Sequence, residues 1–127
     1  MNREPLGLAY LDFDASEDAE GCGSFDAMAS VAPPQWNALQ QEVLGVLAWA
    51  EDAFPGARGP LEEGGAWDFE LQAVEEVATA LQVEPDAGGR TLQVRRGATG
   101  APRTTLSLTL SGSAQFCAAF RDAFGLE

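Results

Sequence analysis

The sequence contains no histidine and no lysine, and each absence excludes a kind of chemistry. Without His, serine and cysteine triads of the usual type lack their general base, and the common His-based zinc sites lack ligands. Without Lys, the chain cannot form a Schiff base or a lysine-containing phosphate loop. The chemistry that remains is acid–base catalysis by carboxylates, a thiol, a hard cation held by carboxylates, or binding without catalysis. No cofactor is predicted.

Basic side chains are scarce, and long hydrophobic runs are missing. Seven arginines face 20 acidic residues, for a net charge of −13, which argues against nucleic acid and anionic membranes as partners. The longest apolar run, 43–50, is too short to span a membrane. The start of the chain does not resemble a signal peptide, because Asp12 interrupts the apolar stretch after Arg3 and Glu4. We therefore predict a cytoplasmic protein whose Cys22 and Cys117 stay reduced.

The length and composition are those of a globular domain. With 127 residues and 46% hydrophobic side chains, the chain can bury a core without metals or disulfides, and we expect one domain over residues 1–127. Isoleucine is also missing, alanine and glycine are frequent, and arginine takes the place of lysine, a bias that indicates a GC-rich bacterial genome.

Hydrophobic alternation in the first half predicts two strands and a helix. Residues 6–13 and 24–31 alternate as strands, and an acidic, glycine-containing loop over 14–23 joins them as a hairpin. After Pro33-Pro34, apolar residues recur at helical spacing from Gln35 to Phe54, and Pro55-Gly56 ends that helix.

The second half predicts further strands and a closing helix. A strand runs from Trp67 to about Ala73, although residues 68–82 also fit a helix. A hairpin follows over 81–94, then a strand over 106–110. The last helix begins near Ser113 and ends at Gly125, and its phenylalanines, Phe116, Phe120 and Phe124, recur every four residues on its buried side.

This order, β-β-α-β-β-β-β-α, predicts an α+β fold. We expect a single two-layer domain in which an antiparallel sheet of five or six strands carries both helices on one face.

The negative charge is concentrated at the front of the chain. Residues 1–76 hold 16 of the 20 acidic residues and two arginines, whereas residues 77–127 are nearly neutral. One interpretation is solubility alone. The other is an acidic surface that binds a basic protein, as inhibitors and immunity-type proteins do, with faster association at low salt. The residues proposed for that contact are Asp14, Glu17, Asp18, Glu20 and Trp49.

Trp49 belongs to this set because it lies off the apolar stripe of its helix. It either contacts a partner or is covered by the following loop around Leu61.

Two groups of carboxylates are alternatives for chemistry. Asp12, Asp14 and Asp18 are candidate oxygen ligands for calcium or magnesium. The EF-hand spacing fails, since Glu17 stands at the glycine position and Gly23 at that of the bidentate glutamate. Asp68 and Glu70, on one side of a strand, could act with Asp12 and Asp14 as acid and base in an enzyme.

The polar side of the late strands is a third candidate. If the helices cover the leucines, a polar face remains open to bind an anionic ligand, a peptide or an acidic patch on a second copy of the chain. It comprises Arg95, Arg103, Thr105, Ser107 and Thr109. The favoured interpretation is a non-catalytic interaction protein; the enzyme or cation-binding protein and the ligand-binding domain remain alternatives, and the oligomeric state stays open.

Overall fold

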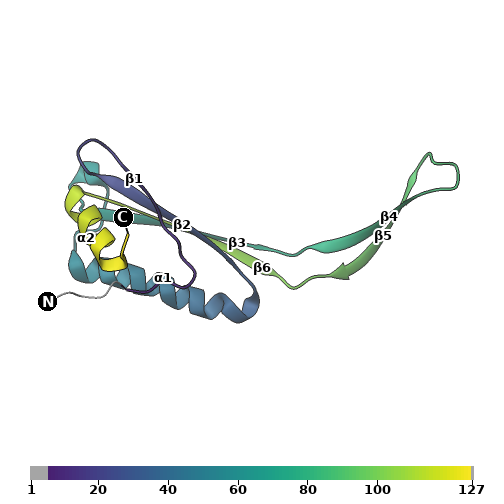
Figure 1. Cartoon of the computed structure of the whole chain (residues 1–127), viewed down its shortest axis with the longest axis horizontal. Coiled ribbons are helices and arrows are strands. Elements are labelled where there is room, and N and C mark those ends of the chain that lie inside the picture. The colour runs from purple at the N-terminus through teal and green to yellow at the C-terminus, as the bar shows by residue number, and fades with distance from the viewer. Residues whose placement is uncertain (1–5, 127) are drawn as a thin grey trace.

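The computed structural model has six strands and two helices in the predicted order, which confirms an α+β fold (Figure 1). It describes residues 6–126; Arg3, Glu4 and Glu127, which enter the charge counts, lie outside them. The strands are β1 (Asp14–Glu17), β2 (Gly23–Val31), β3 (Trp67–Glu76), β4 (Thr79–Pro85), β5 (Leu92–Thr99) and β6 (Arg103–Gly112). The helices are α1 (Pro33–Ala53) and α2 (Ala114–Phe124), with a short 3-10 turn, η1 (Leu61–Glu63), between α1 and β3.

Both helices cover the same face of a four-stranded antiparallel sheet with the order β1-β2-β6-β3 (Figure 1). The covered side is the apolar side of the alternation: Phe25 of β2, Leu110 of β6 and Phe69 of β3 lie side by side in register. Leu39, Val43, Val46 and Ala50 of α1 are buried against it. The two-layer arrangement with both helices on one face is therefore as predicted.

Helix α2 supplies the aromatic part of the core. Its start is capped by Ser113, whose Oγ accepts a hydrogen bond from the amide of Phe116, and it ends at Gly125, where φ is +66°. Phe116, Phe120 and Phe124 are buried, as the spacing predicted. Trp49 of α1 lies against all three of these rings, at centroid distances of 5.5–5.9 Å. Helix α2, and not the loop around Leu61, therefore covers Trp49.

The remaining two strands form an arm that leaves the body. β4 and β5 pair only with each other, in a separate two-stranded sheet that continues the path of β3 and β6 beyond the helices (Figure 1). We call residues 77–102 the arm and the other described residues the body. The sequence predicted one sheet of five or six strands, and the structure divides these strands between two sheets. Residues 68–82, ambiguous in the sequence, form the strands β3 and β4 and no helix.

The tip of the arm is a tight turn closed by Asp86. Its carboxylate accepts hydrogen bonds from Thr91 Oγ1, at 2.7 Å, and from the amide of Arg90, at 3.0 Å. The bond from the Thr91 hydroxyl and the one from the Arg90 amide lower the pKa of Asp86. Gly89 adopts a φ of +66° in this turn, a conformation that other residues adopt at a cost.

The predicted strand over 6–13 is wrong. This segment is a loop, and the first strand, β1, lies in the stretch that was predicted to be the hairpin loop. The loop runs along the body but does not join the sheet. Its backbone N–H groups at Ala9, Tyr10 and Leu11 donate hydrogen bonds to the Glu42 carboxylate of α1, and not to a neighbouring strand. Leu11 and Phe13 are still buried in the core, so the apolar residues of the segment have the environment that their alternation indicated.

We expect Glu42→Gln to loosen this segment. The amide side chain offers one acceptor oxygen in place of two, so at least one backbone N–H loses its partner, which should cost about 1–3 kcal/mol of unfolding free energy. Hydrogen exchange would show the loss as faster exchange at Ala9, Tyr10 and Leu11. Asp52→Asn is the control, since it neutralises an exposed carboxylate of the same helix; equal exchange in both variants would contradict the prediction.

Candidate protein-interaction face

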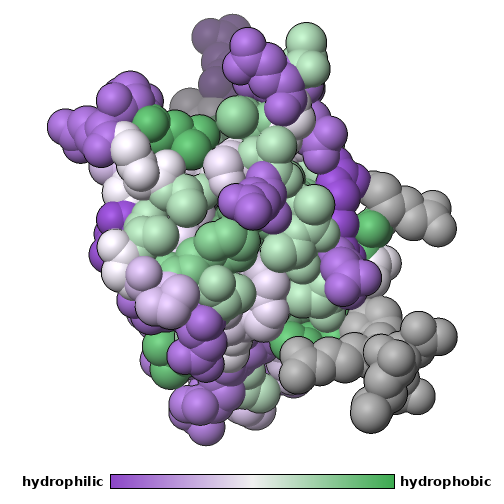
Figure 2. All heavy atoms as spheres, turned by 90° about the vertical axis from the view of Figure 1, so that its left-hand side faces the viewer, coloured by the Kyte–Doolittle hydropathy of each residue, from purple (hydrophilic) through white to green (hydrophobic). Residues whose placement is uncertain are grey.

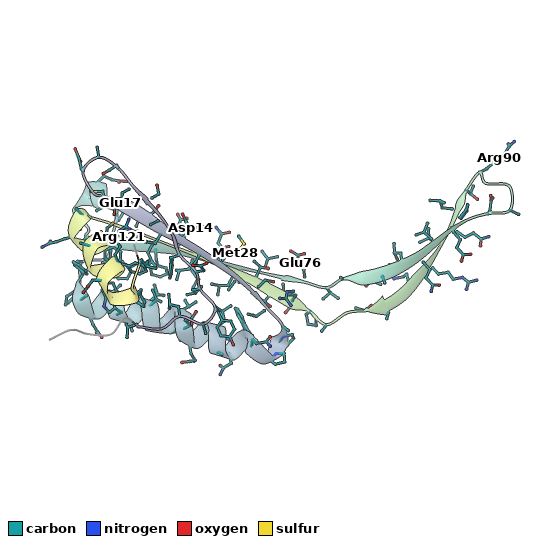
Figure 3. All side chains as sticks on the ribbon, in the orientation of Figure 1. Asp14, Glu17, Met28, Glu76, Arg90 and Arg121 are labelled. Carbon is teal, nitrogen blue, oxygen red and sulfur yellow. The ribbon has the colours of Figure 1, made fainter. Side chains whose placement is uncertain are left out.

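The second face of the four-stranded sheet is covered by no element among residues 6–126. We call it the open face. Figure 3 shows Asp14, Met28 and Glu76 pointing away from the helices on this side. Its side chains form rows across the strands, in the register of the ladder. One row contains Ser16, Ser24, Ser111 and Asp68, the next Asp14, Asp26, Thr109 and Glu70, the next Met28, Ser107 and Gln72, and the last Ser30, Thr105 and Val74.

The second row places acidic residues on three of the four strands. Asp14 and Asp26 are directly opposite on β1 and β2, and Glu70 is two strands further on. Thr109, between Asp26 and Glu70, donates its hydroxyl to Asp26 Oδ1 at 2.6 Å. Like charges directly opposite each other destabilise a sheet, so the Asp14–Asp26 pair lowers the stability of the free protein.

Met28 is the large apolar residue at the centre of the open face. Its exposed fraction is 67%, higher than that of any other exposed large hydrophobic residue of the described chain. A shallow hollow of about 410 Å³ lies beside it, lined by Met28, Ser107, Thr109 and the carboxylates Asp12, Asp14 and Asp26. An apolar side chain within a polar, charged margin is the usual composition of a protein contact, and methionine is enriched there.

The hydroxyl-rich part of the open face contains four of the five residues predicted for ligand binding. Thr105, Ser107 and Thr109 lie on β6 with Arg103 at its start. Arg103 already donates to the side chain of Ser30, at 2.8 Å, and to its carbonyl oxygen, at 3.1 Å. The fifth residue, Arg95, lies on β5 in the arm, where it lines a separate hollow with Gln82, Glu84 and Gln93. The structure therefore does not gather these cations at one anion site.

The residues proposed for an acidic contact are also distributed. Asp14 is on the open face, whereas Glu17 lies on the helix side and pairs with Arg121, with 2.7 Å between Glu17 Oε1 and Arg121 Nη2 (Figure 3). The Asp18 carboxylate accepts hydrogen bonds from the backbone amides of Glu20 and Cys22 and so closes the β1–β2 turn. Trp49 is half-buried under α2, which accounts for its place off the stripe.

Of the carboxylates proposed for catalysis, Asp68 and Glu70 are near neighbours on one side of β3, whereas Asp14 lies across the sheet from them. Asp14 and Glu70 lie on the two edge strands, three strand spacings apart, or about 14 Å at about 4.8 Å per spacing. Carboxylate pairs that cleave glycosidic bonds, for comparison, stand about 5–9.5 Å apart. Asp68, at 3.1 Å from Arg58 Nε, is further engaged in an ion pair. Within residues 6–126, no three acidic or cysteine side chains are arranged to hold a metal ion.

The two cysteines are free, and neither is placed as a nucleophile. Cys117 is buried under the sheet, and burial raises the pKa of its thiol, which disfavours the reactive thiolate. Cys22 is half-buried in the turn between β1 and β2. The sequence interpretation of Cys117 as a core residue is confirmed.

Sequence reasoning missed two residues of this face, Asp26 and Met28. The signal was present, because Asp26, Met28 and Ser30 occupy the side of β2 opposite its buried residues Phe25, Ala27 and Ala29. Alternation places them on one side but does not show that Asp14 is their neighbour, since the first strand was expected over other residues.

No protein-family model matches this sequence, and no curated protein or solved structure is detectably similar to it. In the part of the chain that the structure describes, neither helix is long and apolar enough to cross a membrane.

Proposed function

We propose that this chain is a non-catalytic protein-interaction module, of the inhibitor or immunity type, that binds a basic protein through its open face. The observation that carries the proposal is the exposed Met28 beside aligned carboxylates, on a sheet face that no described element covers. The apolar centre would supply contact area, and the carboxylates would select a partner rich in Lys and Arg.

The charge distribution supports a basic partner. The body has sixteen carboxylates and three arginines among its described residues, so most of its negative charge cannot be neutralised internally. Two of those arginines pair with Asp68 and Glu17, and Arg103 binds Ser30. A surface potential of this kind raises the rate of association with a cationic protein, and salt weakens the effect.

A cytoplasmic location belongs to the same proposal. The two free cysteines fit a reducing compartment, in which they would stay unpaired.

A positive charge introduced at the centre of the open face tests the proposal. We expect immobilised wild-type chain to capture a basic protein from a native cell lysate at 50 mM salt and to lose about tenfold or more of it at 500 mM salt. Met28→Arg should abolish capture at both salt concentrations, because it places a cation among Asp14, Asp26 and Glu70. The side chain is exposed, so the fold should tolerate the change.

Gln41→Arg is the matched control. It adds the same charge at an exposed position of α1, away from the open face, and should capture the partner as the wild type does. Equal capture by the two variants, or capture that salt leaves unchanged, would contradict the proposed face.

A further inference from the structure

The arm carries an apolar surface that no element within residues 6–126 covers. The register places Leu81, Val83, Pro85, Leu92 and Val94 on one side of the β4–β5 ladder. We call these residues the apolar ribbon; its leucines and valines are 49–64% exposed. A two-stranded hairpin is marginally stable alone in water, and contiguous exposed apolar side chains mark contact sites. By contrast, the end of the body opposite the arm shows hydrophobic and hydrophilic residues intermixed (Figure 2).

The ribbon repeats the alternation of the core beyond the point where α1 covers it. In the body, odd-numbered residues of β3 and even-numbered residues of β6 face the helices. The ribbon likewise consists of odd-numbered residues of β4 and even-numbered residues of β5, after a register shift between Thr79 and Leu81. Helix α1 begins at Pro33, which lies with Trp36 beside Glu75 and Thr104, just before the arm starts. The sequence thus encodes a core-like face for the arm without an element of its own to complete it.

The body offers a complementary groove at this same end. It has a volume of about 330 Å³ between α1 and β3 and is lined mainly by apolar side chains, with Trp36, Val43 and Leu44 on one side and Leu71 and Ala73 on the other. Leu44 and Leu71 are 57% and 43% exposed. The groove opens at β3, an edge strand whose outer side has no neighbour in the described chain.

The charges of the two surfaces also match. Arg96 shares the face of the apolar ribbon, opposite Leu81, and Glu75 stands where the groove continues past Trp36. Neither side chain forms a hydrogen bond or ion pair within residues 6–126. The arm as a whole has three arginines and two carboxylates, whereas the body is strongly acidic. Each surface therefore has one charged group placed beside apolar residues, and the two signs are opposite.

From these features we infer that the chain forms a two-fold dimer in which the apolar ribbon of each copy lies in the groove of the other, with Arg96 beside the partner's Glu75. The arm cannot reach the groove of its own chain, because it extends away from the body (Figure 1). A two-fold pair makes the same contact twice, which doubles the buried area. The open face lies on the other side of the sheet from the groove and shares only Gln72, at the edge strand, with its lining, so the contact at Met28 is separate from this one.

Exchange of the two charges tests the inference by sedimentation equilibrium. The wild type should be dimeric at micromolar concentration, and Arg96→Glu or Glu75→Arg alone should each weaken dimerisation about tenfold or more, because like charges then meet at both contacts. An equimolar mixture of the two variants should form a heterodimer of wild-type affinity, since each arm then meets a groove of opposite charge.

Two pairs of variants separate the face of the arm from its charge. Val94→Glu, on the ribbon, should give a monomer, whereas Gln93→Glu, on the other face of β5, should stay dimeric. Arg95→Glu is the corresponding control for Arg96→Glu. The inference would be overturned if the wild type were still monomeric at a concentration 100-fold above the micromolar range. It would also be overturned if the wild type were a dimer and neither these variants nor the mixture changed its dimerisation. Capture of a basic protein through Met28 is measured separately and does not depend on either outcome.

Discussion

Replacing Phe120 with alanine is expected to lower the free energy of unfolding by about 3–5 kcal/mol, the range typical of a truncated buried phenylalanine. Phe120 is fully buried at the point where every layer of the body meets. Its ring lies 4.4–5.8 Å, between centroids, from five other aromatic rings. These belong to Phe13, Phe25, Trp49, Phe116 and Phe124.

Urea unfolding followed by tryptophan fluorescence measures this loss. Phe120→Leu keeps most of the side-chain volume and should cost clearly less than alanine, so it remains measurable if the alanine variant is largely unfolded. Val74→Ala is the surface control, because Val74 is 55% exposed and its truncation should change stability by less than about 0.5 kcal/mol. A loss below about 1 kcal/mol for Phe120→Ala would show that the aromatic cluster does not hold the layers together.

The elements that the sequence predicted well are those whose periodicity is confirmed by tertiary burial. Helix α2 is an example, because its phenylalanines recur every four residues and both its ends have the residues that favour a helix start and stop. β6 is another, since its leucines face the helices and its Thr and Ser residues face outward. In both cases local preference and the environment of the folded chain agree.

Two parts of the structure differ from the prediction, because hydrophobic alternation indicates which way side chains face but not which groups pair with the backbone. Residues 6–13 alternate, and their apolar side chains Leu11 and Phe13 are buried, but a single carboxylate, Glu42, binds the amides that a strand would have paired. β4 and β5 alternate equally well, yet no helix reaches them. The number of strands per sheet depends on where α1 begins in space, which periodicity does not specify.

The candidate site was predicted less completely than the fold for the same reason. The sequence correctly predicted that Thr105, Ser107 and Thr109 share one side of the sheet, because that prediction needs only the two-residue period of one strand, β6. The row that links Asp14 to Asp26 and Glu70 depends on the order β1-β2-β6-β3, in which strands distant in sequence become neighbours. The separation of the open face from the arm likewise follows from topology alone.

Gly112→Ala is the second substitution for which we expect a large effect, a loss of about 3 kcal/mol of unfolding free energy. Gly112, at the end of β6, is buried between Gly23 and Trp67 on the neighbouring strands, and the Phe116 ring lies directly over it. A Cβ at this position would come within 2.3 Å of Phe116 Cδ2 and 2.8 Å of Phe116 Cβ. The ring cannot turn away freely, because it stacks on Trp67 with an angle of 8° between the planes and contacts Phe120.

The same substitution at Gly45 provides the control with the opposite sign. Gly45 is exposed in the interior of α1, and an added Cβ would meet no atom within 4 Å. Alanine there should raise the free energy of unfolding by about 0.5–1 kcal/mol, because glycine is the weaker helix former. Urea unfolding of both variants should therefore separate them by about 4 kcal/mol, as the sum of the two estimates. Equal stability of the two would mean that the Phe116 ring has room to move, and would remove the steric reason for a glycine at the end of β6.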